Sequence, residues 1–254
     1  MSLPFFYAPG LTATNRVTDL DEPTSRHCVQ VLRMRTGDRL ILTDGRGLRV
    51  EARLLEADKR RSSVALEAPV QHPRTGPDVY IGISPVKNTS RFEWFLEKAT
   101  EIGVAGIIPL LCERTERSAL RLDRLEHILV SAMLQSQQVW LPELREPQVF
   151  SGVLATAGGV RYIAHCEEGE KRTLALGGAT GAGADVGQAA ESTAAGTADD
   201  KAATLLIGPE GDFTPNEVTE ALSRGWIPVT LGDTRLRTET AGIVGATLLR
   251  WAAR

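Results

Sequence analysis

The sequence predicts a two-domain protein in which a small β-barrel precedes an α/β domain with a mostly parallel sheet. Three observations lead to this fold class. Residues 1–72 contain short strand-like runs separated by frequent turns, which is typical of a small barrel. The Pro- and Gly-containing stretch 73–77 then predicts a domain boundary by its composition. In residues 73–254, strand-like runs alternate with helical ones, as they do in α/β domains.

The N-terminal domain is expected to hold one short helix and three strands. The helix is predicted for residues 24–35, with Thr24 as its N-cap after Pro23. The strands are predicted for residues 39–43, 48–55 and 62–67. A strong hairpin signal, Asp44-Gly45-Arg46-Gly47, joins the first two strands.

The second domain is expected to alternate strands and helices up to a terminal helix. Strands are predicted for residues 79–84, 107–111, 160–166 and 204–207, and helices for residues 92–102, 122–138 and 240–254. Small residues recur at helical spacing in the last helix (Ala241, Gly242, Gly245 and Ala246). Such a face permits close approach of a ligand, another helix or a second subunit, and ordinary packing within the chain is the alternative.

Two loops stand out as a candidate site. Residues 204–213 and 231–240 each begin with an apolar run, break at a glycine and then place charged residues. The first loop leads into a helix, because Thr214, Pro215 and Glu217 form a capping-box sequence. Ligands of parallel sheets bind beyond the carboxyl ends of the strands, and both loops lie there. An ordinary pair of tight turns remains the other interpretation.

Charge and cysteine content exclude several function classes. The net charge is −3, so no global basic field indicates nucleic acid, although residues 1–72 carry a net charge of +2. Cys28, Cys112 and Cys166 are widely spaced and indicate neither a disulfide framework nor a zinc site. No apolar run reaches the length of a membrane span and no export signal is evident. We therefore expect a soluble cytoplasmic protein without a metal.

Residues 177–201 form a Gly- and Ala-rich stretch without an apolar face. Such a composition cannot bury enough surface to pack into a core, so we expect a flexible insertion on the surface.

The sequence as a whole resembles the RsmE family of small-subunit (16S) ribosomal RNA uridine-N3 methyltransferases, which belongs to the SPOUT class. The resemblance rests on several motifs in order, which are far more specific together than singly. Its strongest parts are the run Ile207-Gly-Pro-Glu-Gly-Asp-Phe-Thr-Pro-Asn-Glu217, then Leu231-Gly232 and Leu236-Arg-Thr-Glu-Thr-Ala241. Upstream matches include Lys87, Arg91, Trp94, Lys98, Glu101, Pro109, Glu113-Arg114, Gln135-Ser136 and Pro142, and further upstream His27, Val31-Leu-Arg33 and Gly37-Asp38.

The resemblance implies a fold, a cofactor and partners. The fold would be a PUA-like RNA-binding β-barrel followed by a SPOUT α/β domain tied in a trefoil knot, which pattern reasoning alone would not suggest. The cofactor would be S-adenosylmethionine, bound in the knotted loops of a homodimer. The RNA partner would be small-subunit ribosomal RNA or the assembled 30S subunit.

Site residues follow from the same resemblance. The cofactor-binding positions would be His165, Ile207, Gly208, Pro209, Glu210, Gly211, Leu231, Gly232, Leu236, Arg237, Thr238, Thr240 and Ala241. The RNA-binding positions would be Arg26, His27, Arg33, Arg35, Lys87, Arg91 and Arg114. Two departures affect this assignment. The family usually has an arginine soon after its Gln-Ser, where this chain offers Gln138 and Trp140, and the Gly- and Ala-rich insertion lies between two of the cofactor loops, so its ends must come out on the surface if the site is to close.

Methyl transfer from a sulfonium to a ring nitrogen requires alignment and loss of the N3 proton, and it requires no metal. Arg237 is the candidate to stabilise negative charge on the uracil oxygens, and Glu239 is the candidate base or orienting group. These two side chains could instead pair with each other, and Glu210 could instead accept turn amides. Alternative functions are a SPOUT enzyme acting on tRNA or another RNA, a non-catalytic RNA-binding assembly protein, and a nucleotide-phosphate enzyme, although no G-x-x-x-x-G-K-[ST] motif is present.

Overall fold

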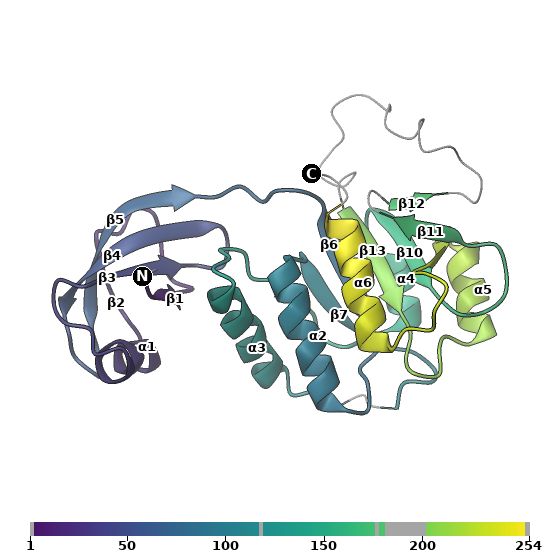
Figure 1. Ribbon diagram of the computed structural model, residues 1–254, viewed down its shortest axis with the longest axis horizontal. Coiled ribbons are helices and arrows are strands. Elements are labelled where there is room, and N and C mark those ends of the chain that lie inside the picture. Colours follow the sequence, from purple (N-terminus) through teal and green to yellow (C-terminus); the bar gives the residue numbers. More distant parts are fainter. Residues whose placement is uncertain (1–2, 117–118, 176–177, 181–201, 252–254) are drawn as a thin grey trace, which may run out of the picture. The chain divides into compact units, whose positions relative to one another are not determined.

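The computed structural model describes residues 3–116, 119–175, 178–180 and 202–251, and these form two compact units (Figure 1). The first unit contains residues 1–75 together with residues 130–141, and the second contains residues 76–129 and 142–254. Residues 130–141 thus join the first unit, although the boundary expected at residues 73–77 assigns them to the second domain.

The first unit is built on a five-stranded sheet in the order β1-β3-β4-β5-β2. Its strands are β1 (Phe5–Tyr7), β2 (Val17–Asp19), β3 (Arg39–Thr43), β4 (Leu48–Glu56) and β5 (Ser63–Gln71). Only the β1–β3 pair is parallel. The predicted strands β3, β4 and β5 are confirmed. The short strands β1 and β2 were missed, because three residues are too few for a period of two to emerge.

The helix of this unit differs from the prediction. It runs as α1 (Glu22–Arg26) followed by a π-helical turn, η1 (His27–Val31). The predicted cap Thr24 is wrong, because Asp21 is the N-cap and its side chain accepts a hydrogen bond from Thr24 N at 2.8 Å. Proline is tolerated in the first helical turn, so the helix starts before Pro23 rather than after it.

The second unit is built on a nine-stranded, mostly parallel sheet. Along the main path the strand order is β12-β11-β14-β10-β13-β6-β7-β8, and β9 also pairs with β7. The strands are β6 (Asp78–Ile83), β7 (Gly106–Leu111), β8 (Glu143–Leu144), β9 (Gln148–Val149), β10 (Val160–Ala164), β11 (Arg172–Ala175), β12 (Gly178–Thr180), β13 (Ala202–Ile207) and β14 (Ile227–Thr230). Among the strands that the structure describes in this sheet, the β11–β12 pair alone is antiparallel. The predicted α/β class is therefore confirmed.

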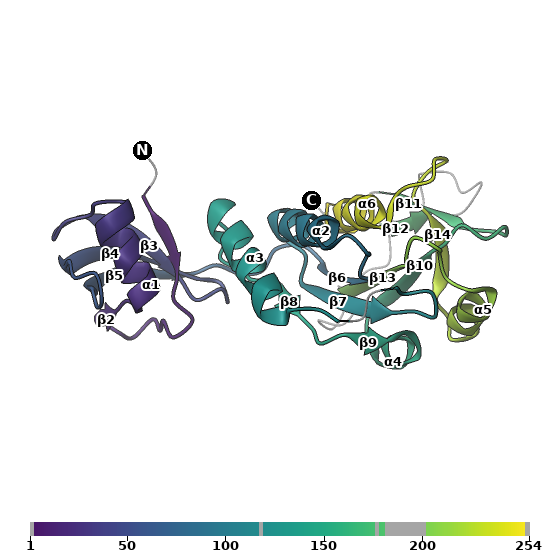
Figure 2. The ribbon, with the colours of Figure 1, turned by 90° about the horizontal axis from the view of Figure 1, so that it is seen from below.

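Helices cover both faces of this sheet. They are α2 (Thr89–Ile102), α4 (Phe150–Thr156), α5 (Pro215–Ser223) and α6 (Thr238–Arg250), whereas α3 (Leu122–Gln135) begins in this unit and ends in the first. Helices α2 and α6 pack side by side on one face, and α4 and α5 lie on the other (Figure 2). The core under α4 and α5 includes Phe150, Leu206, Phe213 and Trp226.

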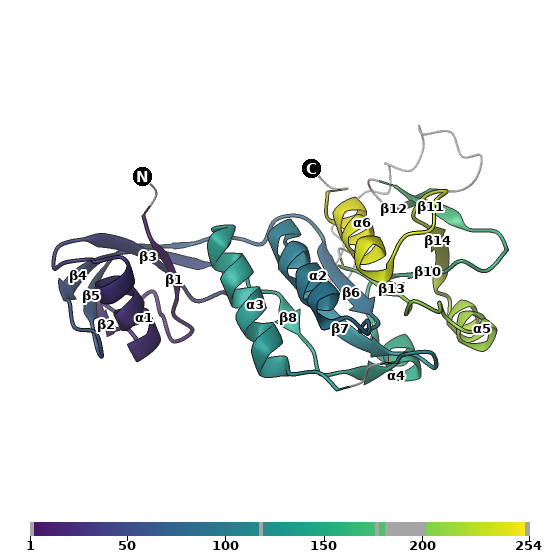
Figure 3. The same ribbon diagram turned by 60° about the horizontal axis from the view of Figure 1, so that its bottom comes forward.

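The small-residue face of α6 serves packing within the chain. A Cβ atom at Gly242 would lie 2.6 Å from Cε2 of Phe95 on α2, and one at Gly245 would lie 2.2 Å from Cδ2 of Leu205 on β13. Close contact of α6 with α2 and with the sheet, visible in Figure 3, therefore depends on these glycines. This outcome matches the alternative of ordinary packing.

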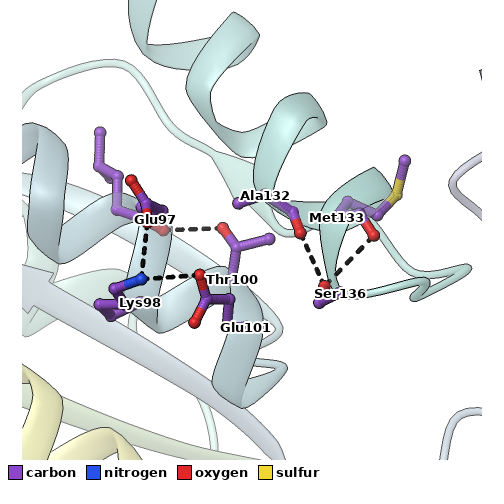
Figure 4. Close-up of polar contacts among 8 residues, drawn as sticks. Glu97, Lys98, Thr100, Glu101, Ala132, Met133 and Ser136 are labelled. Carbon is purple, nitrogen blue, oxygen red and sulfur yellow. Dashed lines mark hydrogen bonds and ion pairs between the residues drawn. The ribbon is translucent and has the colours of Figure 1, made fainter.

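Helices α2 and α3 each carry local polar contacts (Figure 4). On α2, Lys98 Nζ contacts Glu97 Oε1 at 2.6 Å and Glu101 Oε1 at 2.9 Å. On α3, Ser136 Oγ donates to the carbonyl of Ala132 at 2.7 Å just after the helix ends. The α2 helix stops at Gly103, which has the left-handed φ of 89°, as predicted.

The insertion predicted for residues 177–201 lies mostly outside the described residues. Within it, only residues 178–180 are described, and they form strand β12 against β11. The composition did not predict this strand.

Candidate functional site

Three parallel strands bring their carboxyl ends to one place in the second unit. Ala164, the last residue of β10, pairs with Ile207 at the end of β13 and with Val229 of β14. The loops that follow these strands therefore start from one edge of the sheet, where α/β proteins bind their ligands.

Two adjoining cavities open at this edge. The first has a volume of about 490 Å³ and the second about 370 Å³. They share the lining residues Ala164, Cys166, Ile207, Arg235, Leu236 and Ala241. Each is within the usual size range of small-molecule sites, which is roughly 300–1,000 Å³.

Most of the predicted cofactor residues line these cavities. His165, Leu231 and Gly232 line the first; Gly208, Pro209, Glu210, Arg237 and Thr238 line the second; Ile207, Leu236 and Ala241 line both. Gly211 and Thr240 line neither. Seven polar residues at the cavities were not among the predicted cofactor positions: Cys166, Lys171, Asp212, Thr230, Asp233, Thr234 and Arg235. Their position just after a strand end was the available signal for Cys166 and Asp212.

The loop after β13 is held from two sides. Thr238 Oγ1, on the first turn of α6, donates to the carbonyl of Gly208 at 3.1 Å. Arg114 Nη1 donates to the carbonyl of Gly211 at 2.7 Å. A Cβ at Gly208 would lie 3.1 Å from Phe213 N. Glycine at this position therefore lets Phe213 approach the loop backbone closely.

The helix that follows begins with the predicted capping box. Thr214 Oγ1 accepts from Glu217 N at 3.3 Å, and Glu217 Oε2 accepts from Thr214 N at 2.8 Å. The second oxygen of the same carboxylate accepts from Glu113 N at 2.9 Å. Glu217 is buried, and it therefore ties the loop after β7 to the start of α5.

Arg237 and Glu239 occupy different environments at the start of α6. Arg237 is the exposed N-cap residue and lines the second cavity. Glu239 is buried, lines neither cavity, and lies with its Oε1 3.7 Å from Nε of Arg91. Arg91, which was predicted to bind RNA, thus lies beside Glu239, which was predicted to act as a base or orienting group. Among the described contacts, Glu239 pairs with Arg91 and not with Arg237.

His165 is an unusual group at the first cavity. Both of its ring nitrogens are buried and have no hydrogen-bond partner among the described residues. Burial lowers the pKa of His165, and the positive charge of Lys171 lowers it further, while Asp212 opposes the shift. The ring is therefore uncharged at neutral pH.

The predicted RNA-binding residues fall into two groups. In the first unit, His27 packs edge-on against Phe6 at 5.7 Å, Arg26 pairs with Glu22, and Arg33 and Arg35 are exposed just beyond η1. Arg33 has a left-handed φ of 55°. In the second unit, Lys87 Nζ lies 3.3 Å from Glu116 Oε2, while Arg91 and Arg114 make the contacts given above.

A cationic side chain lies beside Trp140, which stands where the family usually has an arginine. The guanidinium of Arg74 lies over the ring of Trp140, 4.8 Å from its centroid, within the first unit. Gln138 also lies in this unit. A positive charge is therefore present beside Trp140, although it comes from another segment.

Among the described residues, no group of three His, Cys, Asp or Glu side chains is arranged to hold a metal ion. No helix in these ranges has the length and apolar character needed to cross a membrane.

The cavities suit a ligand with apolar and hydrogen-bonding parts. Apolar side chains come from Ile207, Val229, Leu231 and Leu236, and the loops contribute main-chain groups between them. The unpartnered nitrogens of His165 are a further polar group beside the first cavity. A nucleoside with a charged amino-acid tail, such as S-adenosylmethionine, matches this mixture of apolar, main-chain and charged groups.

Comparisons with known proteins agree with the geometry. The RNA methyltransferase domain family matches residues 74–250, and the RNA methyltransferase PUA domain family matches residues 20–67. A probable rRNA-methyltransferase from Porphyromonas gingivalis, solved as a crystal structure, is 35% identical with a TM-score of 0.83, and the match covers 99% of this chain and 98% of that one.

Two further relatives carry a more specific name. Ribosomal RNA small subunit methyltransferase E from Neisseria gonorrhoeae, solved bound to S-adenosyl methionine, is 26% identical with a TM-score of 0.79, over 96% of this chain and 95% of that one. The protein of the same name from Synechocystis sp. is 31% identical over 217 residues, 85% of this chain and 66% of that protein. With a PUA domain before a matching catalytic domain, the chain belongs to the RNA methyltransferase family.

Proposed function

We propose that this protein is an S-adenosylmethionine-dependent methyltransferase that methylates N3 of a uridine in small-subunit (16S) ribosomal RNA. The observation that supports this most is the pair of cavities at the ends of β10, β13 and β14, in a chain similar to the cofactor-bound enzyme from Neisseria gonorrhoeae. The substrate follows the names of the relatives. A cytoplasmic location and a homodimer are part of the same proposal.

The cofactor would be held by the residues that line both cavities. Ile207, Leu236 and Ala241 would contact its apolar surface, and the main chain of the loops 208–211 and 231–232 would hydrogen-bond its polar edges. When bound, S-adenosylmethionine supplies an electrophilic methyl group on its sulfonium. The chain's own residues align the uracil, exclude water and stabilise charge.

Arg237 is the residue we assign to the uracil. Its exposed N-cap position beside the second cavity lets the guanidinium reach a base that enters from solvent. Uridine N3 becomes nucleophilic only when its proton leaves, and the resulting negative charge lies largely on the two oxygens. A guanidinium donor stabilises that charge directly.

Glu239 is the weaker catalytic candidate. A buried carboxylate within 3.7 Å of Arg91, and outside both cavities, is better placed to anchor the first turn of α6 than to take a proton from a base. We therefore assign it an orienting role, with Arg91 as its partner and Thr238 and Thr240 as neighbours on the same turn.

The decisive experiment has two arms. In the first, S-adenosylhomocysteine is expected to raise the melting temperature, and ATP is not, because a ligand that binds only the folded state stabilises it. In the second, purified protein is given unmodified 16S RNA, 30S subunits and tRNA, and the methylated base is mapped. Labelling of tRNA alone would replace the rRNA assignment with the tRNA alternative, and no shift with S-adenosylhomocysteine would remove the enzyme assignment.

Arg237→Ala separates binding from chemistry. Methyl transfer is expected to fall by about 100-fold or more, as for loss of an oxyanion donor, while S-adenosylhomocysteine binding stays within about three-fold of wild type. Arg224→Ala, an exposed arginine paired with Glu220 on α5, is the matched control and should leave transfer unchanged. Retained methyl transfer in Arg237→Ala would show that Arg237 is not a catalytic residue.

A further inference from the structure

Asp212 lies where two of the cavity-forming loops meet. Its Oδ2 accepts a hydrogen bond from the main-chain N–H of Cys166 at 2.7 Å. Cys166 stands two residues beyond the end of β10, whereas Asp212 belongs to the loop after β13. One carboxylate thus links two segments that are 46 residues apart in the sequence.

The backbone of Asp212 has an unusual conformation. Its φ is 60°, in the left-handed region, which glycine adopts freely and aspartate and asparagine adopt more readily than other residues. The other carboxylate oxygen, Oδ1, accepts from Phe213 N at 2.8 Å, which supports the local turn. A glycine would therefore satisfy the backbone here, and only a side chain with an acceptor oxygen also reaches Cys166.

The bridge lies at the wall of the cavities. Cys166 lines both cavities and Asp212 lines the second. The same loop is held on other sides by Arg114, through the carbonyl of Gly211, and by Thr238, through the carbonyl of Gly208. Asp212 is the member of this set that fixes the β10 loop, whose residues His165 and Cys166 form one wall of the first cavity.

We propose that Asp212 is a positioning residue for the cofactor: its carboxylate bridge to the Cys166 amide holds the β10 loop against the β13 loop in the binding geometry. This inference rests on the proposed function. Charge-assisted hydrogen bonds to main-chain N–H groups are among the stronger ones. Loss of the bridge therefore frees the β10 loop, which forms one wall of the site. Binding of the cofactor must then also order that loop, and this ordering costs free energy.

Two substitutions at position 212 separate the acceptor from the backbone. Asp212→Gly keeps the left-handed turn and removes the bridge, whereas Asp212→Asn tolerates the turn and keeps an acceptor oxygen. By titration calorimetry, we expect Asp212→Gly to weaken S-adenosylhomocysteine binding by about ten-fold or more, equivalent to about 1.4 kcal/mol. Asp212→Asn should stay within about three-fold of wild type. In turnover assays, Asp212→Gly should raise the KM for the cofactor more than it lowers kcat.

Ala68→Gly is the matched control, because Ala68 also has a positive φ, 42°, but lies on β5 in the first unit. It should leave binding unchanged. Amide hydrogen exchange gives a readout independent of the cofactor: exchange at Cys166 should accelerate in Asp212→Gly and stay slow in wild type and Asp212→Asn.

The outcomes distinguish this inference from the function on which it rests. If wild-type protein binds S-adenosylhomocysteine and Asp212→Gly binds it equally well, the inference is overturned and the proposed function stands. If Asp212→Asn is as weak as Asp212→Gly, the acceptor role is overturned. If wild-type protein does not bind the ligand at all, both fall, and exchange at Cys166 still reports whether the bridge exists.

Discussion

At the scale of single residues, the site contains one histidine that is kept uncharged by its surroundings. His165 lies at the end of β10 with both ring nitrogens buried, and Lys171 shares the lining of its cavity. Burial first and the lysine second lower its pKa. An imidazole in this state can offer one donor and one acceptor without bringing a charge next to a cationic cofactor.

This lowered pKa predicts a pH dependence of stability. The unfolded state has the ordinary histidine pKa of about 6.5, and the folded state has a lower one. As the pH falls from about 6.5 through the lowered pKa, the unfolded chain binds the proton first, so the free energy of unfolding decreases. Wild type should therefore lose stability over this window, and His165→Gln should lose less. Denaturant unfolding at a series of pH values, with His127→Gln as control, measures the difference; identical slopes would contradict it.

At the residue scale, the sequence predicted which segments form the site. It did not predict which side chains of those segments contact one another. Residues at strand ends such as Ile207 and Leu231 were predictable, because glycine-terminated apolar runs mark strand ends. The pairs Arg91–Glu239 and Asp212–Cys166 were not, because their partners are far apart in the sequence and no local pattern signals them.

At the scale of elements, the start of α5 combines a helix cap with a tertiary link. Thr214 caps the helix, and Glu217 joins that cap to the loop after β7 through Glu113 N. Loss of an N-cap hydroxyl costs about 1 kcal/mol. Loss of the Glu217 carboxylate leaves the buried amide of Thr214 without its acceptor, which costs roughly 1–3 kcal/mol, and it also removes the hydrogen bond from Glu113 N.

We therefore expect Glu217→Ala to reduce the free energy of unfolding more than Thr214→Ala does. Denaturant unfolding of both single variants and the double variant measures this order and the coupling between the two side chains. Glu220→Ala, on the exposed part of α5, is the control and should change stability little. Equal effects of the Thr214 and Glu217 changes would contradict the larger contribution expected of Glu217.

Element prediction succeeded where an apolar pattern was long enough. The runs that became β3, β6, β7 and β13 were found, and so was the capping box of α5. The two-residue strands β8 and β9 and the short helix α4 were missed, because these elements are defined by pairing and packing partners. The trefoil knot stays a prediction from resemblance, since it is a property of the whole chain path.

At the scale of the whole molecule, each unit has its own core and its own charge. The first unit packs around Leu40, Leu42, Val50 and Leu54, and the second has a core under α4 and α5 that includes Leu206 and Phe213. The net charge of +2 on residues 1–72 contrasts with an acidic overall chain. Nucleic-acid binding by an acidic protein therefore depends on local arginines, and phosphate contacts release counterions when they form.

The dependence of RNA binding on salt tests this division of charge. Arg33 and Arg35 are exposed beyond η1, whereas Arg39 and Arg53 form ion pairs with Glu51 and Glu67 on the same sheet. Each phosphate contact contributes about 0.7–0.9 to the slope of log affinity against log salt. Replacing both Arg33 and Arg35 with alanine should therefore weaken binding to unmodified 16S RNA and reduce the magnitude of that slope by about 1.4–1.8.

Replacing Arg39 and Arg53 should change the slope little, because their charges are already neutralised within the protein. Fluorescence anisotropy over a salt series measures both slopes. Equal slopes for the two double variants would contradict the assignment of the RNA-binding surface to the turn after η1.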